Sequence, residues 1–211
     1  MQISPETWGI LVGVGAIALV RLLRPRKRRP RVSKSEQASV RAGQVGENRV
    51  TRIFRTLGLT VWPNVHVATG HRTSQCDHLV YGPFGLVVVE TKHWTGTLQR
   101  QTSHQWVQVK PDGSTHRYDS PESQNAYHCQ VVRAVLRQHG LGQVPVVGAI
   151  VLSNRNAVFV SGPGPQPIGS PEEIAQWIQS LPAARSLPKA SRVEGLLRQS
   201  GAGVSRTVPW G

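Results

Sequence analysis

A short turn between two strand-like segments constrains the fold of this chain more than any other feature. Residues 75–81 and 85–91 are rich in apolar and β-branched residues, and Gly82-Pro83-Phe84-Gly85 separates them. Glycine and proline at these positions are typical of a tight turn, so the sequence predicts a β-hairpin. If the turn is centred between Pro83 and Phe84, the numbers of opposing residues sum to 167.

Two acidic residues meet this condition. Asp77 and Glu90 are then cross-strand neighbours on one face, with Cβ atoms about 4.5–5.5 Å apart. Like charges at that distance are destabilising unless a cation or a shared proton lies between them, and oxygen ligands suit Mg²⁺. Lys92 lies two residues after Glu90, so the period of a strand points its ammonium to the same face. A metal ion beside a lysine can activate water and stabilise a phosphate transition state.

A third acid lies on the apolar face of a predicted helix. In residues 44–57 apolar side chains recur at helical spacing, and Glu47 precedes Val50 by three residues. A carboxylate on a packed face is costly unless something pairs with it. The alternative is an acid that water solvates near the start of the helix.

A second predicted helix supplies an amide. Ser120, Pro121 and Glu122 provide an N-cap, a first-turn proline and a first-turn acid for a helix that ends near His139. Gln124 shares a face with Tyr127 and His128, which places its amide on the packed side near the helix start. A solvated polar helix end is the alternative.

The remaining periodic segments complete an α/β order. Strands are expected at 60–67, 97–101, 104–110 and 144–152, and a capping box at Ser170 opens a helix that reaches Leu181. The order of elements predicts a mixed β-sheet flanked by helices. Trp62, Trp94 and Trp106 are expected in the core or covering the sheet, in preference to stacking on nucleobases.

The segments GQVGENRV, SQCDHLVYGPFGLVVVETKHWTGTL and SPESQNAYH resemble the NERD (nuclease-related) domain, which is similar to the PD-(D/E)XK nucleases. The resemblance spans about residues 43–152. It implies a restriction-endonuclease-like fold, with Asp77 and Glu90 as metal-binding acids and Lys92 as the catalytic lysine. It also implies that Glu47 is the helix acid and Gln124 the fourth-motif glutamine.

The N-terminal region predicts a membrane anchor. Residues 8–20 are apolar and uncharged, and with Arg21 snorkelling they approach the shortest length that spans a bilayer. Residues 21–31 then hold seven basic residues and no acid, which places the following chain in the cytoplasm and the N-terminus outside. A buried N-terminal helix and an interfacial helix are the alternatives.

Charge and cysteine content limit the other possibilities. The chain has 25 Lys and Arg against 11 Asp and Glu, but residues 47–182 carry 11 against eight, so the folded part is only mildly basic. Two cysteines are too few for a disulfide scaffold or a structural zinc site. The expected division is an anchor (1–23), a flexible basic linker (24–42), the nuclease-like domain (43–182) and a basic tail (183–211) in which one short helix could form near 193–199.

Two functions are compatible with these features. The first is a membrane-anchored nuclease that uses Mg²⁺ or Mn²⁺ to hydrolyse DNA or RNA. The second is a binding module of the same fold that recognises nucleic acid or a partner protein at the membrane without turnover. Intact acids and lysine favour the enzyme, because a pure binder gains nothing from opposed carboxylates.

Overall fold

The computed structural model describes residues 34–160 and 164–202. The chain has two compact units, Met1–Gln37 and Ala38–Gly211, and apart from the first turn of one helix every described element belongs to the second. The predicted anchor at 1–23 lies outside the described residues. Among the helices within them, none is both long and apolar enough to cross a membrane.

The first sheet confirms the predicted hairpin and its register. Its strands are β1 (Thr60–Thr69), β2 (Arg72–Gly82), β3 (Gly85–Lys92) and β7 (Val146–Leu152), in the order β1-β2-β3-β7. The β2–β3 pairs run from Gly82↔Gly85 to His78↔Val89, as the predicted turn requires. Gly85 has φ +100, a conformation that favours glycine, and a Cβ there would lie 2.6 Å from the carbonyl oxygen of Pro145. β7 pairs with β3 in parallel, so the sheet is mixed.

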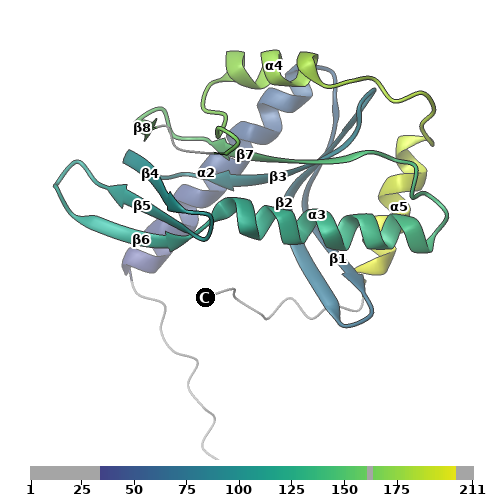
Figure 1. Cartoon of the computed structure of the whole chain (residues 1–211), viewed down its shortest axis with the longest axis horizontal. Coiled ribbons are helices and arrows are strands. Elements are labelled where there is room, and N and C mark those ends of the chain that lie inside the picture. Colours follow the sequence, from purple (N-terminus) through teal and green to yellow (C-terminus); the bar gives the residue numbers. More distant parts are fainter. Residues whose placement is uncertain (1–33, 161–163, 203–211) are drawn as a thin grey trace, which may run out of the picture. The chain divides into compact units, whose positions relative to one another are not determined.

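Helices cover both faces of this sheet (Figure 1). Alternate residues of β3 point to opposite faces: Leu86 and Val88 pack with α3 (Pro121–Gln138) and α5 (Ala190–Ser200), while Val87 and Val89 pack with α2 (Lys34–Thr56) and α4 (Pro171–Ser180). The predicted caps are present, with Ser120 at the start of α3 and a capping box at Ser170 of α4. β3 therefore carries no polar side chain before Glu90, near its carboxyl end.

A second mixed sheet has the order β6-β5-β4-β8, so the expectation of a single sheet is corrected. Its strands are β4 (Gly96–Thr102), β5 (Gln105–Val109), β6 (Thr115–Asp119) and β8 (Ala157–Val160). The strands β4 and β5 were expected, but β6 was missed because it is polar and mostly exposed. β8 was missed because it is only four residues long.

One carboxylate connects the second sheet to α3. Glu122, in the first turn of α3, accepts hydrogen bonds from Nε of Arg100 at 2.9 Å and from the indole of Trp106 at 2.7 Å. Arg100 and Trp106 are both buried, so the charge of Arg100 is compensated at this junction. The second sheet is therefore fixed next to the start of α3.

Two predicted boundaries are corrected. α2 begins at Lys34, so residues 34–42 of the predicted flexible linker are helical. The C-terminal segment is not a tail up to residue 200, because α5 packs against β1 and α3 and buries Val193 and Leu197 completely. Both segments looked like linkers because they are rich in polar and basic residues, yet in α5 two apolar residues four positions apart, Val193 and Leu197, suffice to dock one helix face.

Candidate active site

The predicted site residues converge at the carboxyl end of β3, where helices approach from both faces of the sheet. β3 supplies Glu90 and Lys92, and α2 supplies Glu47. The close approach of α2 depends on Gly46, because a Cβ at this position would lie 2.4 Å from Oγ of Ser153. A larger residue would displace the helix and move Glu47 away from the end of the strand.

Glu90 is the buried centre of the site. Its side chain is 3% exposed, and Nζ of Lys92 lies 2.7 Å from Oε1. The same ammonium donates a hydrogen bond of 3.1 Å to Oε1 of Gln124. Lys92 is thus held between an acid of its own strand and an amide of α3, on the face that the sequence predicted.

Gln124 reaches this position from the helix surface. Its side chain is exposed, and the buried face of α3 is formed by neighbours such as Asn125 and His128. The prediction that Gln124 lies on the packed side is therefore wrong, although its amide does belong to the site. Exposure at the helix start allows the amide to bend over the end of β3 to Lys92.

A histidine that the sequence did not single out faces the second oxygen of Glu90. Nε2 of His128 lies 3.4 Å from Oε2, and neither atom has a hydrogen-bond partner. On the other side of the ring, Nδ1 lies 2.7 Å from Oγ of Ser74. Burial opposes the charge of Glu90, but His128 and Lys92 together outweigh this and lower the pKa of Glu90 below its ordinary value. Glu90 is therefore ionised.

Asp77 lies where the two central strands separate. The β2–β3 ladder ends at His78↔Val89, one pair short of the predicted Asp77 and Glu90 pair. Oδ2 of Asp77 instead accepts a hydrogen bond of 2.8 Å from the backbone amide of Thr91 and so replaces the missing ladder partner. The β1–β2 pairing also skips Asp77 and Asn64, whose φ is +50. Asp77 is thus at a break in the sheet and not in a regular cross-strand pair.

The pKa of Asp77 is shifted in the opposite direction to that of Glu90. Burial and the charge of Glu90 raise the pKa of Asp77 to about 8, although Thr91 and Lys92 act against this. One of the two acids is then ionised and the other largely protonated near neutral pH. The predicted repulsion is real, and in the absence of metal a proton relieves it.

Glu47 is the third acid of the group and is half-buried. Partial burial and the charge of Glu90 raise its pKa. The turn of α2 that carries it is held by His78, whose Nε2 lies 3.1 Å from the carbonyl oxygen of Glu47 and 2.9 Å from Oγ1 of Thr51. Burial lowers the pKa of His78 to about 4, so this histidine is a neutral packing residue.

The donor chemistry fits a hard divalent cation in part. Asp77 and Glu90 are carboxylates whose mutual repulsion a cation would relieve, and Mg²⁺ needs only one or two carboxylates because it keeps several waters. Within residues 34–160 and 164–202, however, no group of three or more His, Cys, Asp or Glu side chains is placed to hold a metal. A metal at this site would therefore depend on two acids and on water.

Two contributors to the site were not predicted as such. His128 lies four residues after Gln124 on the same helix, a spacing that was visible in the sequence. No sequence pattern pointed to Ser74. The break at Asp77 changes which residues of β2 share a face, so strand alternation could not predict that Ser74 belongs to the site. Cys76 and Cys129 are both free and buried.

Comparison with known families agrees with this geometry. Residues 42–153 match the family model described as NERD, nuclease-related domain, which covers more than half of the chain. The matched range contains all five predicted site residues together with Ser74 and His128. No curated protein and no solved structure matches the chain. The chain therefore belongs to the nuclease-related domain (NERD) family, consistent with a relationship to the PD-(D/E)XK nucleases.

Proposed function

We propose that the protein is a divalent-metal-dependent nuclease that hydrolyses phosphodiester bonds of DNA or RNA, and that its domain has a restriction-endonuclease-like fold. The observation that carries the proposal is the meeting of Asp77, Glu90 and Lys92 at the end of β3. The pKa of one acid is raised and that of the other lowered. Neighbouring acids with opposed shifts are typical of sites that perform acid–base or metal chemistry.

Asp77 and Glu90 are the residues that would hold Mg²⁺ or Mn²⁺. When bound, such an ion polarises the phosphoryl oxygens and neutralises part of the charge of the phosphate. Binding requires that Asp77 lose its proton, because a carboxylate ligates a metal in its ionised form. Asp77 is half-buried as a residue, so it is not fully enclosed by the sheet and helices.

Lys92 is proposed to stabilise the transition state. Its ammonium is paired with Glu90 and hydrogen-bonded to Gln124, so it is fixed in direction before a substrate arrives. A cation that is already oriented stabilises the negative charge that develops on the phosphoryl oxygens. Gln124 is then a positioning residue for Lys92.

Glu47 is proposed to accept the proton of the attacking water. Lys92 is paired with a carboxylate and is not free to serve as the base. Its raised pKa makes Glu47 a stronger base than an ordinary carboxylate. The proton on the departing oxygen would come from solvent. Water reaches this end of the sheet, because the side chain of Gln124 is exposed there.

Residues 1–23 are proposed to anchor the protein in a membrane, with the domain in the cytoplasm. The support is the apolar segment at 8–20 followed by seven basic residues at 21–31. Deletion of residues 1–23 should move the protein from the membrane fraction to the soluble fraction. A truncated chain that still sediments with washed membranes would contradict the anchor, and a domain digested by external protease in intact cells would contradict the orientation.

A non-catalytic binding module remains the second candidate. The observation in its favour is that Lys92 and His128 already compensate Glu90 without any metal. A protein that binds nucleic acid and metal but cuts no substrate would support this candidate.

The cleavage of labelled DNA and RNA by the full-length protein in Mg²⁺ or Mn²⁺ tests the proposal. Single-stranded, duplex and branched substrates should be offered in parallel. Asp77→Asn should abolish cleavage and Lys92→Met should strongly reduce it, whereas Lys110→Met, which changes a lysine in the β5–β6 turn, should leave it unchanged. Cleavage that survives Asp77→Asn, or that proceeds in EDTA, would contradict the proposed site.

A further inference from the structure

A row of aromatic side chains leads away from the proposed reaction site. Nζ of Lys92 lies 5.7 Å from the ring centroid of Trp94. Trp94 stacks on Tyr118 with centroids 4.6 Å apart and planes 22° apart, and Tyr118 stacks on His116 with centroids 6.4 Å apart. We call Trp94, Tyr118 and His116 the aromatic row. It begins at the lysine of the site and continues along β6.

The row differs from the aromatic core beneath it. Trp106 contacts Trp94 but is completely buried, and its indole is bonded to Glu122. Trp94 and Tyr118 are half-buried, and His116 is exposed. Stacking of an exposed histidine on a tyrosine gains little from hydrophobic burial, so a structural role alone does not account for the outer end of the row.

The tyrosine at the centre of the row is fixed in place. Its hydroxyl donates a hydrogen bond of 3.1 Å to Oε1 of Gln108, and the amide of Gln108 donates one of 2.7 Å to the carbonyl oxygen of Thr95. Thr95 is the neighbour of Trp94 in the chain. The rings of Tyr118 and Trp94 are therefore held in place by these hydrogen bonds as well as by their own contact. Because the rings are already ordered, binding of a ligand costs no entropy for ordering them.

We propose that the aromatic row is a stacking platform for unpaired nucleobases, so that the substrate is single-stranded or carries a single-stranded flap or branch. This inference rests on the proposed function, because it assigns a substrate class to the same site. Every nucleobase presents a π-face, and aromatic side chains bind single strands by stacking on it. Bases inside a duplex are already stacked and cannot use the row. The contact of Lys92 with Trp94 would place the phosphate next to a stacked base at the proposed metal site.

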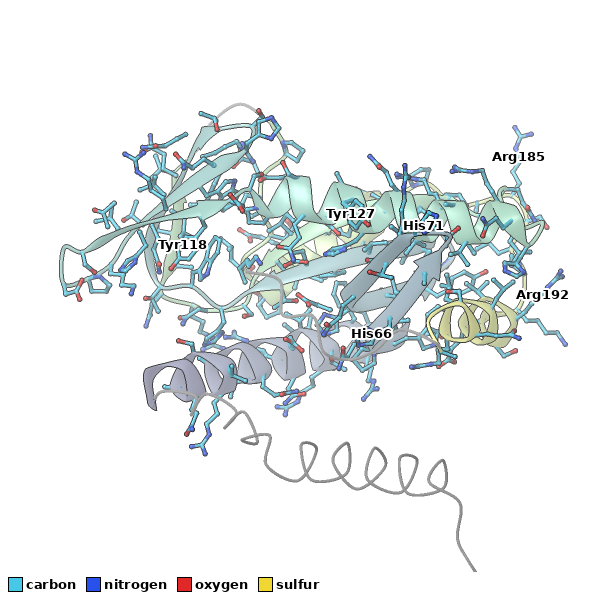
Figure 2. All side chains as sticks on the ribbon, turned by 90° about the horizontal axis from the view of Figure 1, so that it is seen from below. His66, His71, Tyr118, Tyr127, Arg185 and Arg192 are labelled. Atoms are coloured by element: carbon cyan, nitrogen blue, oxygen red, sulfur yellow. The ribbon has the colours of Figure 1, made fainter. Side chains whose placement is uncertain are left out.

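Binding of a fluorescent single-stranded oligonucleotide tests the platform, measured by anisotropy with the full-length protein in EDTA so that no cleavage occurs. His116→Ala and Tyr118→Ala should each weaken single-strand binding about five-fold or more. Tyr118→Phe keeps the ring and should bind nearly as wild type. His71→Ala is the matched control, because His71 is an exposed histidine on the β1–β2 turn, far from Tyr118 (Figure 2). Binding of the matching duplex should be unchanged in all four variants.

Three outcomes separate the platform from the nuclease. If His116→Ala, which changes an exposed residue and should fold normally, binds single strands as wild type does, the platform is wrong. If it weakens single-strand and duplex binding equally, the row is a general contact and the platform is also wrong. If single-strand binding depends on the row but the wild type cuts nothing in Mg²⁺ or Mn²⁺, the platform stands and the proposed nuclease activity fails.

Discussion

Nζ of Lys92 lies 2.7 Å from Oε1 of Glu90, two residues earlier on β3. The alternation of a strand places these two side chains on one face, and the burial of Glu90 makes their pairing strong. Because Lys92 pairs with Glu90, the acid that takes up a proton is Asp77, which lies at the break in the sheet. The charge state of the site is thus set by three residues on two adjacent strands.

Lys92→Met should separate chemistry from metal binding. The thioether keeps the contact with Trp94 but removes the charge, so we expect cleavage to fall by about 10²–10³-fold. The loss of one partner of Glu90 should also lower the free energy of unfolding by about 1–2 kcal/mol, less than for a fully buried pair because Lys92 is partly solvated. Chemical denaturation and Mn²⁺ titration would measure both effects. Full activity in this variant would exclude Lys92 from the mechanism.

The stability of the metal-free protein should fall as pH rises from 6.5 to 8. The pKa of Asp77 is about 8 in the folded state against an ordinary 3.8, so the folded protein binds more protons in this range. Stability is then lost as pH rises, by at most about 1.4 kcal/mol per pH unit. His78 acts in the opposite direction, because its pKa of about 4 lies below the ordinary 6.5, but only below pH 6.5. Urea denaturation in EDTA should show a flatter profile for Asp77→Asn, and identical slopes would contradict the raised pKa.

His128→Ala should lower both the stability of the protein and its affinity for metal, because His128 faces the second oxygen of Glu90. The substitution removes the ring nitrogen that faces Oε2 of Glu90 and the one that lies next to Oγ of Ser74. We expect a loss of about 2–4 kcal/mol in unfolding free energy and a 10–100-fold loss, as a rough range, in Mn²⁺ affinity. Isothermal titration calorimetry and thermal denaturation measure these quantities, with exposed His139→Ala as the control. Unchanged metal affinity would limit His128 to packing.

Glu122→Gln should destabilise the junction of α3 and the second sheet. The amide cannot compensate the buried charge of Arg100, so we expect a loss of about 2–3 kcal/mol. Glu172→Gln, an exposed first-turn acid of α4, should cost less than about 0.5 kcal/mol. Equal effects of the two substitutions in urea denaturation would show that the contact with Arg100 is not stabilising.

The hairpin and the site residues were predictable because each depends on local rules. The turn at Gly82 to Gly85 fixed the register, and the register placed Asp77, Glu90 and Lys92 near one another. The helix caps at Ser120 and Ser170 depend on side chains within three residues and were also predicted. The resemblance to the NERD family implied the same five candidate residues.

The features that were missed depend on contacts distant in sequence. β6 and β8 form because β5 and β4 provide edges for them: β6 has no apolar pattern of its own, and β8 is apolar but only four residues long. A helix near 193–199 was expected, but its docking was not, because α5 docks through Val193 and Leu197 onto a surface that exists only after β1 and α3 have packed. The break at Asp77 involves Asn64 on a third segment, so no pattern within the hairpin could reveal that the ladder ends before the two acids pair.

The most direct test is a crystal structure of the protein grown with Mn²⁺, with the metal located by its anomalous scattering. We expect an ion that contacts the carboxylates of both Asp77 and Glu90, with the amide of Thr91 still bonded to Asp77 or released by a small rotation of its side chain. The anomalous peak of this ion should be lost in crystals of the Asp77→Asn variant, which would show that the ion depends on Asp77. Crystals with Mn²⁺ bound elsewhere, or with no ion between Asp77 and Glu90 above pH 8, would contradict the metal-dependent site.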